Sequence, residues 1–357
     1  MVVYALSVDL NLNNFNYNWN LKDGYPAEGI DHHKKKVFGT FICGGGSTMG
    51  YKLAGYDHLG GVEFDKQVSE VYKLNHNPKY LYTEDIREFN KRNDLPKELY
   101  ALDILDGSPP CSTFSIAGSR EKAWGKTKKF REGQALQTLD DLVFVYCDTI
   151  LKLKPKVFVL ENVKGIIQGN AKWYSKEIYK KMSENGYSIQ VFILNAASMG
   201  VPQRRERIFF IGHKKEFNLQ KLELKFNEKE ILFKDIKNNS LSNKKLSKEE
   251  LSLWQQRKYI DNNMADTKKR IGLPYTRFNT VYIKDNKVMN TIVANDNAIL
   301  YSESRKLNKI EYCLGGAYPL DYNFNTMIPS YLIGMSVPPV MTAQIANQIY
   351  NQWLSKL

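Results

Sequence analysis

Short apolar runs alternate with helix-length amphipathic stretches between Val37 and Gly212, and this pattern constrains the fold of the 357-residue chain more than any other feature. The apolar runs have the length and composition of buried strands and occupy 37–42, 59–63, 100–105, 157–160, 189–194 and 208–211. Apolar residues at spacings of three and four predict a helix over 134–152, with one face packed on the sheet. Strands alternating with helices predict an α/β fold with a doubly wound, mostly parallel sheet.

The alternation stops after Gly212, and the chain becomes polar, basic and irregular until about Tyr301. We therefore expect an N-terminal extension (1–36), a large domain (37–213), a smaller irregular domain (214–302) and a C-terminal segment (303–357). Pro338 and Pro339 can begin a helix in that last segment. The apolar side of this helix should pack back against the large domain through Ile345, Ile349 and Trp353.

Positive charge is concentrated in the smaller domain. The whole chain has 51 Lys or Arg against 38 Asp or Glu, a net charge of +13. Residues 214–287 hold 18 of the former and 10 of the latter, which is +8 in about a fifth of the chain. This favours a polyanionic partner, although a solvated, lysine-rich surface explains the charge equally well.

Composition excludes several classes of protein. A hydrophobic content of 43% is typical of a globular chain and excludes a disordered or collagenous one. No apolar run approaches the roughly 18 residues of a membrane span, and residues 1–14 do not resemble a signal peptide, so we expect a cytoplasmic protein without a membrane partner. The four cysteines are far apart, which indicates neither a disulfide framework nor a metal site.

A glycine-rich turn follows the first predicted strand, at 41–46, and leads into a helix. Glycines let the backbone approach a ligand closely, and a helix start offers free amide donors. Glu63 ends the second strand, where a carboxylate typically accepts ribose hydroxyls, and Asp85 could receive an adenine amino group. Each feature alone is also compatible with an ordinary tight turn or surface carboxylate.

Three further motifs follow strands of the predicted sheet. Cys111 comes directly after Pro109 and Pro110, in a stiff loop at the edge where open α/β sheets bind ligands. Glu161 ends another strand, and a charge-rich turn over 203–207 leads into the next. A lone cysteine is more often an inert packing residue, and charged turns are usually solvated. All three of these motifs, however, lie at strand ends.

Taken in order, these motifs resemble the DNA cytosine-5 methyltransferases, which use S-adenosylmethionine. The resemblance spans about Val37 to Trp353 and includes the turn at 41–46, Pro110–Cys111, Glu161–Val163, Gln203–Arg207 and a late segment over 305–337. It implies a Rossmann-like methyltransferase sheet with a target-recognition domain at 214–302. It also implies methyl transfer to C5 of a flipped-out cytosine in a specific double-stranded DNA sequence.

The resemblance assigns roles to individual residues. Cys111 would add to C6 of the cytosine, Glu161 would protonate or share a proton with N3, and Arg207 would donate to O2, with Arg205 supporting it or contacting a phosphate. Residues implied for the cofactor, which leaves as S-adenosylhomocysteine, are Phe41, Cys43, Gly44, Gly45, Gly46, Glu63, Phe64, Asp85, Ile86, Pro110, Leu142, Ser336 and Val337. Residues implied for the substrate are Pro110, Asn162, Val163, Gln203, Thr291 and Arg305.

The same resemblance implies a bacterial or phage-encoded monomer, with a separately acting restriction endonuclease as a candidate partner. The chain departs from the family pattern at Cys43, which replaces a glycine, at Met335, which replaces an Asn, and at the longer turn Gly315–Pro319. Three alternatives stay open from sequence. They are a tRNA cytosine-5 methyltransferase, a non-catalytic nucleotide- or DNA-binding module, and an α/β dehydrogenase, which would leave the Pro-Cys loop unexplained.

Overall fold

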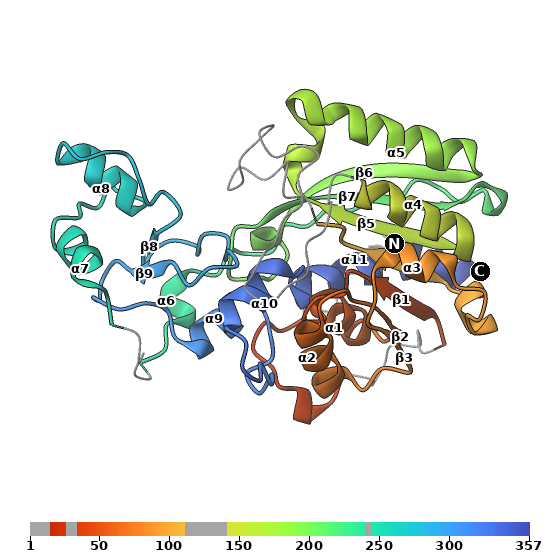
Figure 1. Ribbon diagram of the computed structural model, residues 1–357, viewed down its shortest axis with the longest axis horizontal. Coiled ribbons are helices and arrows are strands. Elements are labelled where there is room, and N and C mark those ends of the chain that lie inside the picture. Colours follow the sequence, from red (N-terminus) through yellow and green to blue (C-terminus); the bar gives the residue numbers. More distant parts are fainter. Residues whose placement is uncertain (1–14, 26–33, 111–140, 240–244) are drawn as a thin grey trace, which may run out of the picture.

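The computed structural model describes residues 15–25, 34–110, 141–239 and 245–357 (Figure 1). Its main sheet has seven strands in the order β3-β2-β1-β4-β5-β7-β6. The strands are β1 (Lys36–Thr40), β2 (Asp57–Val62), β3 (Tyr80–Tyr82), β4 (Ile104–Gly107), β5 (Val157–Asn162), β6 (Tyr187–Asn195) and β7 (Glu206–Lys214). Strands β1 to β5 pair in parallel, and β7 pairs antiparallel to both β5 and β6. The predicted doubly wound, mostly parallel sheet is confirmed.

Successive strand residues point to opposite faces of the sheet. Both faces are apolar, and helices cover both. Val157 and Val159 face a core shared with α1 (Gly46–Leu53) and α11 (Pro339–Gln352). Phe158 and Leu160 face the other core, shared with helices α3 (Ile86–Lys91), α4 (Leu142–Leu153) and α5 (Lys172–Glu184). Helix α2 (Lys66–His76) follows β2. The strand order reverses between β1 and β4, which is where open α/β sheets bind ligands.

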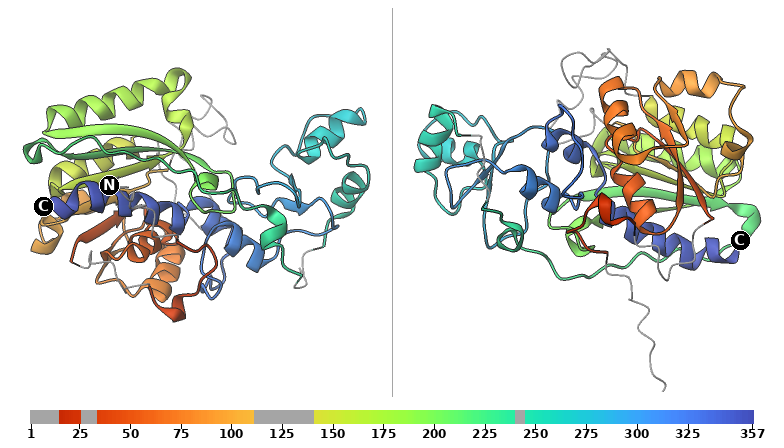
Figure 2. Two further views of the ribbon diagram at one scale, coloured as in Figure 1. Left: turned by 180° about the vertical axis from the view of Figure 1, so that it is seen from behind. Right: turned by 90° about the horizontal axis from the view of Figure 1, so that it is seen from below.

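The later part of the basic segment forms a lobe that projects to one side of the sheet in Figures 1 and 2, whereas its start packs on the large domain, with Leu222 buried beside Trp353. The elements of the lobe are α6 (Phe233–Ile236), α7 (Lys248–Gln255), α8 (Met264–Arg270) and a parallel pair of short strands, β8 (Val281–Ile283) and β9 (Ala298–Leu300). The chain returns through α9 (Lys309–Gly315) and α10 (Pro329–Met335). Short 3₁₀ helices are found at Leu21–Asp23, Lys97–Tyr100, Lys164–Ile167, Gly169–Ala171, Ala196–Ser198, Lys215–Phe217 and Leu354–Lys356.

The C-terminal helix begins at Pro339, and Ile345, Ile349 and Trp353 are buried in the core beside α1, as the sequence indicated. The strand expected at 100–105 was placed too early. Lys97–Tyr100 is a 3₁₀ helix with Pro96 as its N-cap, and the strand begins only at Ile104. Helix α4 begins at Leu142, and residues 134–140 of the predicted helix lie outside the described part. Among the described helices, none has both the length and the apolar content needed to cross a membrane.

Candidate active site

The glycine-rich turn adopts a backbone that only some residues tolerate. Phe41 and Cys43 have positive φ angles of 55° and 48°, and Gly45 has a φ of 76°. A Cβ on Gly45 would lie 2.2 Å from Nε2 of His76, so a side chain cannot be placed there without displacing buried groups. The turn therefore needs glycine at position 45 and strains the cysteine at position 43.

Glu63 holds the turn from the neighbouring strand. Its Oε2 accepts a hydrogen bond from the amide of Cys43 at 2.9 Å, and its Oε1 accepts one from the amide of Asp65 at 2.9 Å. Burial raises the pKa of Glu63 to about 7. Each carboxylate oxygen has a second acceptor site, so the group can still receive two ribose hydroxyls.

Apolar residues predicted for the cofactor lie together beside the turn. Ile86 and Leu142 are buried against one another, and Phe41 packs on them. Asp85 is the N-cap of α3, accepting a hydrogen bond from the amide of Arg87, and it also pairs with the Arg87 guanidinium at 3.1 Å. The structure therefore brings an apolar surface and a carboxylate from α3 to the same edge of the sheet as Glu63.

The C-terminal segment closes over the turn. Tyr318 donates a hydrogen bond to Oγ of Ser336 at 2.7 Å, and Tyr322 donates one to the carbonyl of Gly44 at 2.6 Å. A Cβ on Gly46 would lie 2.2 Å from the carbonyl of Val337, so the two segments are in close contact. The sequence interpretation missed both tyrosines, because tyrosines in an aromatic-rich stretch do not indicate which of them are buried.

A second group of predicted residues meets where β5 ends and β7 begins. Nε of Arg207 pairs with Oε1 of Glu161 at 2.9 Å, and the two side chains are only 14% and 11% exposed. The antiparallel pairing of β5 with β7 causes this, since Asn162 pairs with Ile208 in the register. A carboxyl group and a guanidinium are thus held together in a largely buried place.

Asn162 connects this pair to the loop that follows β4. Its side-chain amide donates to the carbonyl of Pro109 at 3.3 Å, and its Oδ1 accepts from the amide of Val163 at 2.8 Å. Pro110 is the last described residue of the loop, and Cys111 lies outside the described residues. Asn162, the neighbour of Glu161, therefore holds Pro109, two residues before Cys111 in the sequence.

Two residues of the charged turn are interior, which the sequence interpretation did not foresee. Gln203 is 1% exposed, with its amide nitrogen donating to the carbonyl of Gly315 and its oxygen accepting from the amide of Ile292, both at 2.9 Å. Arg205 is 2% exposed and donates to the carbonyls of Ile292 and Gly334. The turn therefore ties the lobe to the C-terminal segment, while the substrate contact predicted for Gln203 and the support of Arg207 or a phosphate predicted for Arg205 stay predictions.

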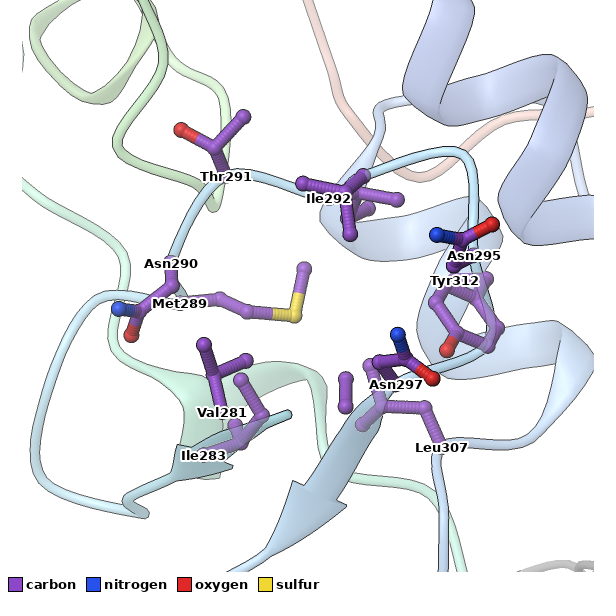
Figure 3. Close-up of a pocket in the computed structure, with 12 residues that line it drawn as sticks. Val281, Ile283, Met289, Asn290, Thr291, Ile292, Asn295, Asn297, Leu307 and Tyr312 are labelled. Carbon is purple, nitrogen blue, oxygen red and sulfur yellow. The ribbon is translucent and has the colours of Figure 1, made fainter. Parts of the chain in front are cut away.

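Thr291 and Arg305, both predicted to contact the substrate, make contacts within the chain. Thr291 donates to the carbonyl of Arg204, and Arg305 pairs with the fully buried Glu311 at 2.8 Å. Figure 3 shows Met289 pointing into a small cavity in the lobe while Thr291 points away from it. The volume of that cavity, about 10 Å³, suits at most one water molecule and no nucleoside.

The described residues around the glycine-rich turn fit S-adenosylmethionine. Glu63 has the chemistry for the ribose, Phe41, Ile86 and Leu142 provide an apolar surface for adenine, and the start of α1 offers amide donors for a carboxylate. Within the described ranges, no three His, Cys, Asp or Glu side chains gather in a way that could hold a metal ion.

The model of the C-5 cytosine-specific DNA methylase family matches residues 36–351 of this chain. The chain belongs to that family. It is similar to the Type II methyltransferase M.FnuDI of Fusobacterium nucleatum, with 33% identity over 60% of this chain and 59% of the relative. It is also similar to the Type II methyltransferase M.DdeI of Desulfomicrobium norvegicum, with 36% identity over 50% of this chain and 41% of the relative. The chain spans about half the length of the curated relatives it matches.

Solved structures share the fold of this methylase-family chain. One, described as a DNA modification methyltransferase encoded within a prophage (E. coli), has a TM-score of 0.62 and 20% identity, covering 89% of this chain and 99% of its own. Another, a Spodoptera frugiperda DNMT2 mutant, has a TM-score of 0.64 and 15% identity, covering 89% and 100%. At these identities the likeness establishes the Rossmann-like methyltransferase fold.

Proposed function

We propose that this chain transfers a methyl group from S-adenosylmethionine to C5 of a cytosine in a specific double-stranded DNA sequence. The observation that carries the proposal is the buried Glu161–Arg207 pair, joined through Asn162 to the Pro109–Pro110 loop that leads to Cys111. A module that only binds DNA or a nucleotide would not need a carboxyl group, a guanidinium and a cysteine loop at one sheet edge. The family membership and the Type II methyltransferase relatives support DNA as the substrate.

The cysteine begins the reaction in this proposal. Cytosine C5 is a weak nucleophile, so the thiolate of Cys111 adds to C6 and electron density moves toward N3 and O2. Glu161, protonated when the base is bound, gives its proton to N3, and Arg207, held beside it, donates to O2 and stabilises the charge that develops there. When bound, S-adenosylmethionine supplies the electrophilic methyl group that the activated C5 accepts. A water molecule then takes the C5 proton, the N3 proton returns to Glu161, and the Cys111 thiolate is expelled.

The remaining predicted residues have supporting roles in the proposal. Glu63 and Asp85 orient the ribose and adenine of the cofactor, while Ser336 and Val337 close its site from the C-terminal side. Gln203 and Arg205 position the recognition lobe relative to the sheet, and Arg205 also supports Arg207.

A stacked cytosine is out of reach of Cys111, so the target base must be flipped out at a cost of a few kcal/mol. We assign the compensating DNA contacts to the basic lobe at 214–302, whose exposed lysines can bind phosphates. We further propose that the protein acts as a cytoplasmic monomer in restriction-modification, alongside a separate endonuclease.

Bisulfite sequencing of DNA from cells that express the chain tests this function. We expect 5-methylcytosine at one short sequence, and none in cells that express Cys111→Ser. Methylation of RNA with unmodified DNA would contradict the proposed substrate. The absence of any methylated base, with a folded protein that binds the cofactor, would contradict the proposed reaction.

A further inference from the structure

Asp106 is a buried carboxyl group that belongs to none of the motifs described above. It lies in β4, next to β1, and is 4% exposed. The hydroxyl of Tyr51 donates to its Oδ1 at 3.2 Å, and the hydroxyl of Ser47 also hydrogen-bonds to it. Ser47 and Tyr51 are four residues apart on α1, the helix that begins in the glycine-rich turn. The carboxyl group therefore joins β4 to the helix that follows the turn.

The backbone around Asp106 has little freedom to move. Oγ1 of Thr40, in β1, donates to the carbonyl of Asp106 at 3.2 Å. A Cβ on the next residue, Gly107, would lie 2.3 Å from the ring of Tyr146, so α4 packs directly against the strand there. Because β1 and α4 hold this part of β4, Asp106 is a fixed point to which α1 is attached.

Burying a carboxyl group at this interior position has a cost in desolvation free energy. Burial raises the pKa of Asp106 to about 7, and the nearby Glu161 adds to the shift, while Ser47 and Tyr51 oppose it. Leucine has a similar shape and would pack without that cost. It would, however, leave the hydroxyls of Tyr51 and Ser47 buried without this acceptor.

We propose that Asp106 is a positioning residue for S-adenosylmethionine, fixing the first turns of α1, and with them the amide groups of the glycine-rich turn, through Tyr51 and Ser47. The proposal rests on the proposed function, because it takes the cofactor to bind at that turn. It predicts that the hydrogen-bond acceptor at position 106 matters for cofactor affinity, and that the negative charge itself does not.

The test is calorimetry with S-adenosylhomocysteine on the full-length chain, which requires neither DNA nor turnover. We expect Asp106→Leu to bind it about tenfold or more weakly, since it removes the acceptor of two buried hydroxyls. Asp106→Asn should stay within about threefold of wild type, because its amide oxygen can accept the same bond from Tyr51. In steady-state assays, Asp106→Leu should raise the KM for S-adenosylmethionine more than it lowers kcat.

Asp103 provides a matched control at the other end of β4. It is 6% exposed, accepts a hydrogen bond from the amide of Lys36 at 2.7 Å and pairs with Lys156 at 2.9 Å. Asp103→Leu should therefore destabilise the fold but keep its affinity for S-adenosylhomocysteine within about twofold. An equal loss of affinity in both leucine variants would reduce Asp106 to a general structural residue and overturn the proposal.

If Asp106→Leu does not fold, Tyr51→Phe tests the proposed positioning role of Asp106 instead. It removes one donor to Asp106 and should weaken binding about threefold or more, and combined with Asp106→Leu it should add no further loss. Wild-type affinity in folded Tyr51→Phe or folded Asp106→Leu would overturn the proposal. A wild-type chain that binds no S-adenosylhomocysteine would instead contradict the proposed function on which it rests.

Discussion

Arg207 and Glu161 form an ion pair of 2.9 Å between the start of β7 and the end of β5. The antiparallel pairing of these strands brings together two residues that are 46 positions apart in the sequence. The pair connects the fold to the proposed chemistry, because one partner is assigned to N3 of the target base and the other to O2.

Glu161→Gln should lower kcat for DNA methylation by about 10²- to 10⁴-fold, because the amide cannot deliver a proton to N3. Single-turnover transfer of a labelled methyl group measures this. Glu206→Gln is the matched control, since Glu206 is 51% exposed and pairs with Lys164 in solvent. The assignment fails if the two variants have similar rates.

Cofactor binding should depend on pH through Glu63, whose pKa burial raises to about 7. Only the ionised group accepts both ribose hydroxyls with its full charge, so affinity for S-adenosylhomocysteine should fall by up to about tenfold per pH unit below 7 and level off above it. Glu63→Gln should bind about ten- to a hundredfold more weakly and lose this dependence. If the dependence persists in Glu63→Gln, a group other than Glu63 is responsible.

The strained cysteine of the turn should respond to substitution in a specific order. Cys43 has a φ of 48°, so Cys43→Gly should leave the free energy of unfolding unchanged or raise it by about 1 kcal/mol, as relief of strain outweighs the added backbone entropy. Cys43→Val should lower it by about 1–3 kcal/mol, because β-branched residues resist this conformation. Urea denaturation checks the order, and a valine variant as stable as the glycine variant would contradict it.

DNA affinity should depend on exposed lysines of the lobe. Replacing Lys269, exposed at the end of α8, by Gln should lower the slope of log affinity against log salt by about 1 without changing the methylated sequence. Lys154→Gln is the control, because Lys154 is exposed just before β5, at the opposite end of that strand from Glu161. Equal slopes for Lys269→Gln and wild type would place the phosphate contacts elsewhere.

Much of the fold followed from the sequence because most strands of the large domain contain an apolar run, and several are followed by a distinct motif. Strand β3 was not among the predicted apolar runs, although Asp85 was expected at a strand end, since Tyr80–Tyr82 is short, only partly buried and lies at the sheet edge. The helices and strands of the lobe could not be predicted from the sequence, because these elements are short and the lobe core depends on long-range contacts.

The candidate site could also be predicted only in part. Glu161 and Arg207 could be assigned to one site from the family resemblance, whereas charged turns such as 203–207 are usually solvated surface. Nothing local in Gln203 or Arg205 shows that they are buried, because their partners, Ile292, Gly315 and Gly334, are more than 80 residues away. Asp106 did carry a signal, a charged residue inside an apolar strand, but the strand was expected to end at Leu105.

The most direct test of the account is covalent trapping on DNA that carries 5-fluorocytosine at the methylated position. Attack by Cys111 and methyl transfer can proceed, but fluorine cannot leave C5 as a cation, so the thiolate cannot be expelled. We predict an enzyme–DNA adduct that survives denaturing electrophoresis, depends on S-adenosylmethionine for its full stability and is absent with Cys111→Ser. Absence of the adduct on DNA that the enzyme methylates, or its formation with Cys111→Ser, would show that Cys111 is not the nucleophile.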